Sequence, residues 1–161
     1  MTDELSSDIL EKQFGPTQID VLHHDEEVRF VQTRVKATGQ ILELSFVGFH
    51  APVVDKFEEI RQEVMNGKSL GKAFRDKGVA FVRHQQVAER RELPDVFGKQ
   101  FASSGLVTVV AATIVVGDEQ LEYAEVLETY SPDVSWPEIG GQLSEEQQSK
   151  LELLTKFVES L

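Results

Sequence analysis

The feature that most constrains the fold is a pair of β-prone runs within residues 105–136, joined by a Gly-Asp-Glu-Gln turn at residues 117–120. Two such runs on either side of a short turn predict a β-hairpin. With the turn centred on Asp118 or its neighbour, side-chain alternation places residues from both runs on one shared face. These are Val107, Val109, Ala111, Thr113 and Val115 from the first run, and Glu122, Ala124, Val126, Glu128 and Tyr130 from the second.

Glu128 is the unusual member of this face. Glu122 lies beside the turn and reaches water, whereas Glu128 lies deep in an otherwise apolar ladder. A buried carboxylate without a partner costs several kcal/mol, and its pKa rises unless a cation or hydrogen-bond donor is near. The opposite face carries Glu125 among apolar residues, so alternation leaves open which face is inside. We predict that Glu128 is buried near an arginine.

The size of the chain suits one globular domain. It has 161 residues, of which 40% are hydrophobic and 27% are charged, so it is long enough to bury a core. We expect a single domain over residues 1–161, with its core at about 19–136 and an added amphipathic helix at about 143–160.

The charge and the residue types exclude several classes of function. A net charge of −12 opposes binding to nucleic acid or to an anionic membrane, because both depend on lysine and arginine near phosphates. The absence of cysteine excludes disulfides, thiolate nucleophiles and cysteine-ligated metals. The N-terminal residues lack a secretion signal, and no apolar run approaches the ~20 residues of a membrane span. We expect a cytoplasmic protein that binds neither nucleic acid nor a membrane.

Two adjacent histidines, His23 and His24, raise the question of a metal site. Neighbours on a strand point to opposite faces, and no further ligand follows at a metal-binding spacing. We expect a solvated turn at 23–26 after a short strand at 19–22, and no metal or other cofactor. The serines and glycines match neither a nucleophile elbow nor a nucleotide-binding loop.

A second hairpin is predicted from residues 28–36 and 41–50. With Thr38 and Gly39 as the turn residues, its rungs pair Val35 with Leu42, Thr33 with Leu44, Val31 with Phe46, and Arg29 with Gly48. The reverse face pairs Arg34 with Glu43 in an exposed ion pair.

Arg29 is the arginine of interest in this hairpin. It ends an apolar face opposite a residue without a side chain, and its guanidinium can bond both oxygens of a carboxylate. The alternative is an arginine that extends from the strand end into solvent.

The remaining segments predict helices at 3–14, 52–66, 70–77, 94–101 and 143–161. Ser69 caps the third, and its Leu70-Gly71 start allows the backbone to approach a ligand closely. A strand at 79–87 carries Arg83, and the charged run at 89–92 indicates a solvated connection. Antiparallel hairpins with such helices predict an α+β fold, in which one antiparallel sheet is covered by helices.

The last helix carries an apolar stripe of Leu151, Leu154, Val158 and Leu161, with Ser144 and Gln147 as a capping box. We expect the stripe to pack on the rest of the domain. A contact in a homodimer is the alternative.

Three motifs resemble the chorismate lyase-like family, whose fold is shared with the UTRA ligand-binding domains of bacterial transcription regulators. The stretch from Lys68 to Phe74 is similar to the Leu-Gly helix start of the lyases, and Arg83 follows where that family has an arginine. Glu128, four residues before Pro132, is similar to their Glu-x3-Pro motif, and the hairpin around Gly39 matches their strand-turn-strand unit. In the family, a ligand-binding arginine lies about eight residues before the turn glycine. That position is Val31 here, and Arg29 lies two residues further away on the same strand face.

The resemblance implies a pocket between sheet and helices for a small carboxylated metabolite. In this interpretation Arg29 or Arg83 holds a carboxylate, the Leu70-Gly71 backbone bonds another oxygen, and Glu128 contacts a ring hydroxyl or donates a proton. One hypothesis is a cofactor-independent carbon–oxygen lyase that eliminates pyruvate from chorismate. The other is a non-catalytic module that senses a metabolite or docks on a protein.

Overall fold

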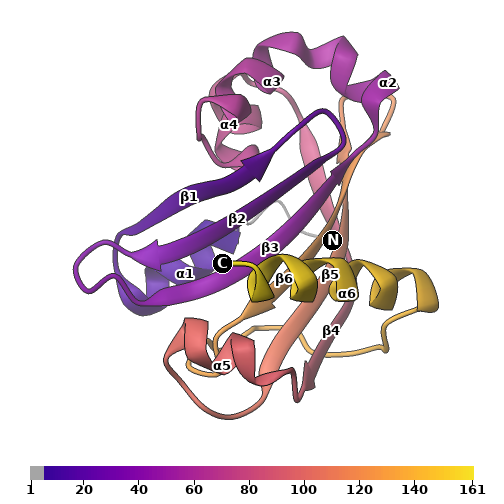
Figure 1. The fold of residues 1–161 in the computed structure, drawn as a ribbon. Coiled ribbons are helices and arrows are strands. Elements are labelled where there is room, and N and C mark those ends of the chain that lie inside the picture. Colours follow the sequence, from indigo (N-terminus) through magenta and orange to yellow (C-terminus); the bar gives the residue numbers. More distant parts are fainter. Residues whose placement is uncertain (1–5) are drawn as a thin grey trace.

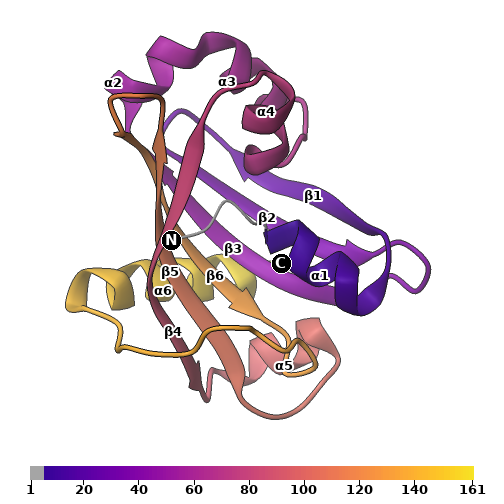
Figure 2. The same cartoon turned by 180° about the vertical axis from the view of Figure 1, so that it is seen from behind.

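The computed structural model describes residues 6–161 and contains one six-stranded antiparallel sheet, in the order β1-β2-β3-β6-β5-β4 (Figures 1 and 2). The strands are β1 (Thr17–His24), β2 (Val28–Val35), β3 (Ile41–Phe49), β4 (Phe81–Arg91), β5 (Val107–Val116) and β6 (Leu121–Tyr130). The helices are α1 (Ser6–Phe14), α2 (Ala51–Val54), the 3-10 turn η1 (Asp55–Phe57), α3 (Glu58–Met65), α4 (Leu70–Asp76), α5 (Asp95–Phe101) and α6 (Glu145–Glu159). The predicted fold class, a single antiparallel sheet covered by helices with an added C-terminal helix, is confirmed.

Helices cover both faces of the sheet. Figure 1 shows α5 and α6 in front of the sheet, and Figure 2, turned by 180°, shows α1 and α4 in front of the opposite face. Phe97 of α5 and Leu154 of α6 belong to one hydrophobic cluster, and Ile60 of α3 and Phe74 of α4 belong to a second. Every residue of β5 is buried because the strand is covered on both faces.

The register of the first hairpin differs from the predicted one by one residue. Val35 bonds Gln40 beside the turn and Arg34 pairs with Ile41, two residues away from the predicted partner. A β-bulge between Thr33 and Arg34 then shifts the pairing back by one residue, so that Arg29 lies opposite Val47 rather than Gly48, and Thr33 lies opposite Glu43. One extra residue in a strand moves the partner strand's side chains to the other face. The predicted register is therefore wrong.

The predicted Arg34–Glu43 ion pair is also wrong. Arg34 instead bonds Asp20 of β1, with 2.6 Å between Nε and Oδ2. Glu43 is only 5% exposed and lies on the face covered by α1 and α4. The turn places Arg34 opposite Ile41, and the bulge places Glu43 on the face of Thr33.

The central hairpin contains a second bulge, between Ile114 and Val115. Glu128 therefore pairs with Val110 and shares its face with the even-numbered residues of β5, not with Val109 and Ala111 as predicted. The turn before β6 ends at Gln120, which adopts the left-handed conformation with φ 52°. The predicted hairpin is present, and its predicted face is wrong.

Several predicted boundaries also change. The helix expected at 52–66 is divided into α2, η1 and α3, since Phe57 leaves helical geometry at φ −125°, ψ 54°. The run at 89–92 is not a solvated connection, because β4 continues to Arg91 and pairs with β5. The strand expected at 19–22 runs from Thr17 to His24 and includes both histidines. Of the helix expected at 3–14, residues 3–5 lie outside the described part of the chain.

The predicted helix caps and the predicted C-terminal helix are present. Ser69 accepts a hydrogen bond from the Lys72 amide at the start of α4, and Ser144 forms a capping box with Gln147 at the start of α6. The apolar stripe of α6 packs on the sheet, as predicted, although Leu161 lies beyond the helix and is exposed. Within residues 6–161, none of the helices has the length and apolar character needed to cross a membrane.

Candidate functional site

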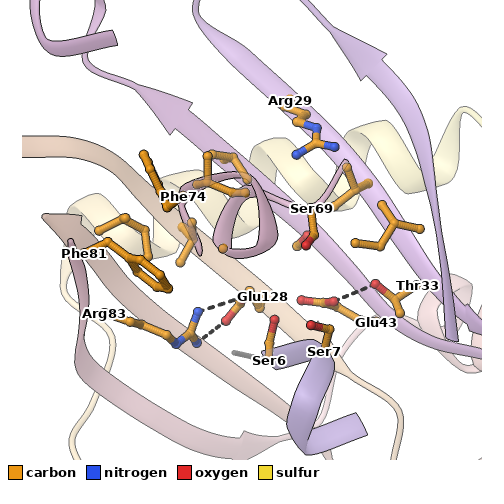
Figure 3. Close-up of a pocket in the computed structure, with 18 residues that line it drawn as sticks. Ser6, Ser7, Arg29, Thr33, Glu43, Ser69, Phe74, Phe81, Arg83 and Glu128 are labelled. Atoms are coloured by element: carbon orange, nitrogen blue, oxygen red, sulfur yellow. Dashed lines mark hydrogen bonds and ion pairs between the residues drawn. The ribbon is translucent and has the colours of Figure 1, made fainter. Parts of the chain in front are cut away.

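A cavity of about 90 Å³ lies between the sheet and the helices α1 and α4 (Figure 3). Residues of all six strands line its sheet side, and Ser6 and Ser7 of α1 line it from the helix side. The cavity brings together the site residues predicted from the sequence, namely Arg29, Leu70, Gly71, Arg83 and Glu128. Their roles in binding a ligand stay predictions.

Arg83 and Glu128 form a buried ion pair across β5. The Nη1 atom of Arg83 lies 3.0 Å from Oε2 of Glu128, and Nη2 bonds Oε1. The two residues are 7% and 5% exposed. Burial lowers the pKa of Arg83, but Glu128, Tyr130 and Glu43 together raise it above its usual value, so the guanidinium stays charged. The prediction that Glu128 is buried near an arginine is confirmed.

Arg83 has a further contact on its other side. Its guanidinium carbon lies 5.7 Å from the centre of the Trp136 ring, in a cation–π arrangement. The Trp136 indole N–H donates to Gln85 at 2.9 Å. Arg83 is therefore held by Glu128 and Trp136, and its bidentate contact with Glu128 occupies the fork that a carboxylate ligand would need.

Arg29 has a different environment. It is 2% exposed, so it does not extend into solvent. Its Nη2 donates to the Lys68 carbonyl at 3.1 Å, while its Nε has no partner among the described residues. Over residues 6–161, no carboxylate lies within ion-pair distance of this guanidinium. Burial lowers the pKa of Arg29 to about 10, so it remains a cation at neutral pH.

Glu43 is a second acid in the cavity, and sequence reasoning misses it. Its Oε1 accepts a hydrogen bond from Thr33 Oγ1 at 2.8 Å. Burial, together with the nearby negative charge of Glu128, raises the pKa of Glu43 to about 8. At neutral pH this side chain is therefore mostly a neutral carboxylic acid. The sequence does contain one signal for it: odd- and even-numbered positions around Glu43 are both apolar, as in a strand that is covered on both faces.

The two ends of the cavity have different chemistry. Figure 3 shows Arg29 at one end and Glu43, Glu128 and Arg83 at the other. Apolar residues form the walls between them, including Val31, Val47, Phe74, Ile114 and Val126. Leu70 and Gly71, at the start of α4, line the cavity on the helix side. The arrangement can hold one anionic group at the Arg29 end and a hydrogen-bonding group at the Glu43 end.

The histidines lie outside this cavity. His23 bonds Asp25 at 2.8 Å on the surface, and His24 stacks on Phe49. In the part of the chain that the structure describes, no cluster of three or more acidic or histidine side chains could hold a metal ion.

Comparisons with known proteins give structural likenesses only. No protein-family model and no curated protein matches the sequence. The C-terminal domain of the histidine utilization repressor from Pseudomonas syringae pv. tomato is similar at a TM-score of 0.48 and 6% identity, with 81% of this chain and 100% of that chain covered. The possible transcriptional regulator YydK from Bacillus subtilis is similar at 0.46 and 12% identity, over 87% of this chain and 66% of that one. The C-terminal domain of PhnF is similar at 0.46 and 14% identity, over 81% and 78%. Because these scores are below 0.5, the description of the fold rests on the strand order, and any function rests on the cavity.

Proposed function

We propose that this protein binds a small carboxylated metabolite in the cavity between the sheet and the helices α1 and α4, without converting it. The observation that carries the proposal is the environment of Arg29, a cation that is 2% exposed and has no carboxylate partner among the described residues. We assign it the role of carboxylate receptor. The proposed binding uses no metal or other cofactor, and its expected setting is the cytoplasm.

The physical argument concerns the cost of a buried charge. Removing an ion from water costs several kcal/mol, and a counterion with good geometry offsets this cost. Arg83 already has such a counterion in Glu128, whereas Arg29 donates only to the Lys68 carbonyl. A ligand carboxylate can accept from the free donors of Arg29 and neutralise it. The ligand would thus complete an arrangement that the protein alone leaves incomplete.

Lyase activity on chorismate is a second candidate, with one observation in its favour. Glu43 holds a proton at neutral pH inside the cavity and could protonate a leaving group. Glu128, the residue assigned to this role by the family resemblance, instead forms a bidentate pair with Arg83. The cavity volume of about 90 Å³ is smaller than the roughly 150 Å³ of a cavity that binds benzene, so it is small for a ring dicarboxylate such as chorismate. Binding without turnover is therefore the better supported function.

The test is a binding titration with propionate, lactate, 4-hydroxybenzoate and chorismate, using the wild type and two variants. Arg29→Met removes the proposed receptor at similar volume. Arg34→Met is the matched control, because Arg34 lies on the same strand and pairs with Asp20 outside the cavity.

We expect at least one carboxylate to raise the melting temperature of the wild type and of Arg34→Met, but not of Arg29→Met. Equal affinity in Arg29→Met and in the wild type would contradict the proposal. Ultraviolet detection of 4-hydroxybenzoate released from chorismate, in the same samples, would support the lyase instead.

A further inference from the structure

The charges around the cavity limit which acids it can accept. We infer that the cavity selects small monocarboxylic acids and rejects dicarboxylic acids, and that Glu43 is the residue that sets this selectivity. This inference rests on the proposed function and specifies its class of ligand.

The first step is the count of charges that face the cavity. The positive charge of Arg83 and the negative charge of Glu128 cancel in their bidentate pair. Arg29 contributes one further positive charge that no described carboxylate neutralises. If Glu43 is protonated, the net charge of the cavity is +1, which matches one carboxylate.

The second step is the position of Glu43. It lies on β3, where its neighbour Ser45 pairs with Glu128, so the two acids are one rung apart on adjacent strands. Figure 3 shows the Glu43 carboxyl group between Thr33 and Glu128. Like charges at this spacing disfavour double ionisation, and Glu128 keeps its charge because Arg83 binds it, which supports a proton on Glu43. A second ligand carboxylate at this end would find no free cation, because Arg83 is already paired with Glu128.

The titratable groups near Glu43, within the part of the chain that the structure describes, agree with this count. They are Glu128 and Tyr130 on β6, Arg83 on β4 and Arg29 on β2. The helix α1, which covers this end, contributes Ser6 and Ser7 to the cavity, and neither carries a charge. The burial that raises the pKa of Glu43 to about 8 also raises the pKa of Tyr130 well above its usual value.

The third step is the size of the ligand. The cavity measures about 90 Å³, whereas a cavity of about 150 Å³ holds benzene, with its six non-hydrogen atoms. A ligand of about four to six non-hydrogen atoms is therefore the size that fits without movement of the helices. Apolar walls formed by Val31, Val47 and Val126 suit a short hydrocarbon body. A hydroxyl at its far end can accept a hydrogen bond from the protonated Glu43.

The experiment compares propionate and lactate with malonate, a diacid of the same carbon number. Binding is measured by nuclear magnetic resonance titration at pH 6.5 and 8.8, in the wild type and in Glu43→Gln. At pH 6.5 we expect propionate and lactate to bind at least about tenfold more tightly than malonate. Malonate brings a second negative charge into a buried site that has no free cation for it.

The pH dependence tests the role of Glu43. In the wild type, we expect binding of propionate to weaken by up to about sevenfold at pH 8.8, because ionised Glu43 cancels the charge of Arg29. Glu43→Gln keeps a neutral amide at this position, so it should retain affinity at pH 6.5 and lose this pH dependence. The selectivity measured in the wild type needs no variant, so it stands even if Glu43→Gln folds poorly.

The outcomes separate the two proposals. Malonate binding as tightly as propionate, with both lost in Arg29→Met, would overturn the selectivity and leave the proposed function intact. An unchanged pH dependence in a folded Glu43→Gln variant would overturn the role of Glu43. Failure of every carboxylate to bind through Arg29 would overturn the proposed function itself.

Discussion

The buried ion pair of Arg83 and Glu128 makes the fold sensitive to the loss of either partner. Each has the other as its partner, so removing one leaves an uncompensated charge in the core. We predict that Glu128→Ala lowers the free energy of unfolding by about 3–5 kcal/mol. Adding Arg83→Met to this variant should recover most of the loss, because no buried charge then remains. Urea denaturation of the single and double variants measures both effects.

A neighbouring acid on the same strand provides the control. Glu125 faces α6 and pairs with Lys150 at a partly exposed site. Glu125→Ala should cost no more than about 1 kcal/mol, as is usual for exposed pairs. A similar loss in Glu125→Ala and Glu128→Ala would show that burial of the Arg83–Glu128 pair does not govern its contribution.

Glu43 makes stability depend on pH in a predictable direction. Its pKa is about 8 in the folded protein and about 4.5 when unperturbed, because burial and Glu128 disfavour its charge. The folded state therefore binds the extra proton, and this contribution is complete below about pH 4.5 and lost as the pH rises through 8. We predict that the wild type loses on the order of 2 kcal/mol relative to Glu43→Gln between pH 6 and 9. Urea denaturation across this range measures the difference, and parallel curves for the two proteins would contradict the prediction.

Among the described residues, the sequence indicates three of the four charged side chains of the cavity but not their pairing. Arg29 and Glu128 stand out because each is an ionisable residue on an otherwise apolar strand face, whereas Arg83 is indicated by the family resemblance. Glu43 does not stand out, because the predicted turn at Thr38 and Gly39 places it opposite Arg34 as an exposed pair. Only the observed register shows that Glu43 lies opposite Thr33, on the buried face.

At the scale of elements, two bulges account for the main errors of sequence reasoning. The hairpins and the turns between them follow from β-prone runs and glycines, and both are present. A bulge adds one residue to one strand, and no local composition marks the one between Thr33 and Arg34. The sequence therefore predicts which side chains of one strand point to the same face of the sheet. It does not predict which side chains of the neighbouring strand share that face.

The helix α6 is an integral part of the fold rather than a free extension. Leu154 is 1% exposed and packs in the cluster formed with β3, β5 and α5, while its neighbour Leu153 is 52% exposed. We predict that Leu154→Ala lowers the free energy of unfolding by about 2–5 kcal/mol, because a cavity forms in a packed core. Leu153→Ala, one residue away on the same helix, should change it by less than about 0.5 kcal/mol. Thermal and urea denaturation compare the two, and equal effects would show that α6 is not packed as described.

The molecule as a whole has two unequal faces. Large apolar side chains fill the space between the sheet and the helices α5 and α6, including Phe97, Phe101 and Leu154. The opposite face also buries large side chains, such as Phe74 and Tyr130, but it carries charged residues as well, and there the cavity opens under α1 and α4. Although the protein has a net charge of −12, Arg29 gives this cavity a cation that can hold a small anion. Charged side chains thus lie on the face assigned to binding, whereas the face under α5 and α6 is packed with apolar residues.

The two faces should respond differently to a ligand. We predict that saturation with a carboxylate slows amide hydrogen exchange in α1, α4 and β2, which surround the cavity, and leaves local exchange in α5 and α6 unchanged. At a ligand concentration of 100 times Kd, binding opposes local opening of the site by about 2.7 kcal/mol, or about 100-fold in exchange rate. Hydrogen exchange with mass spectrometry, using propionate with wild type and Arg29→Met, measures the pattern. Protection confined to α5 and α6 would place the ligand on the other face, and protection that persists in Arg29→Met would remove Arg29 as its receptor.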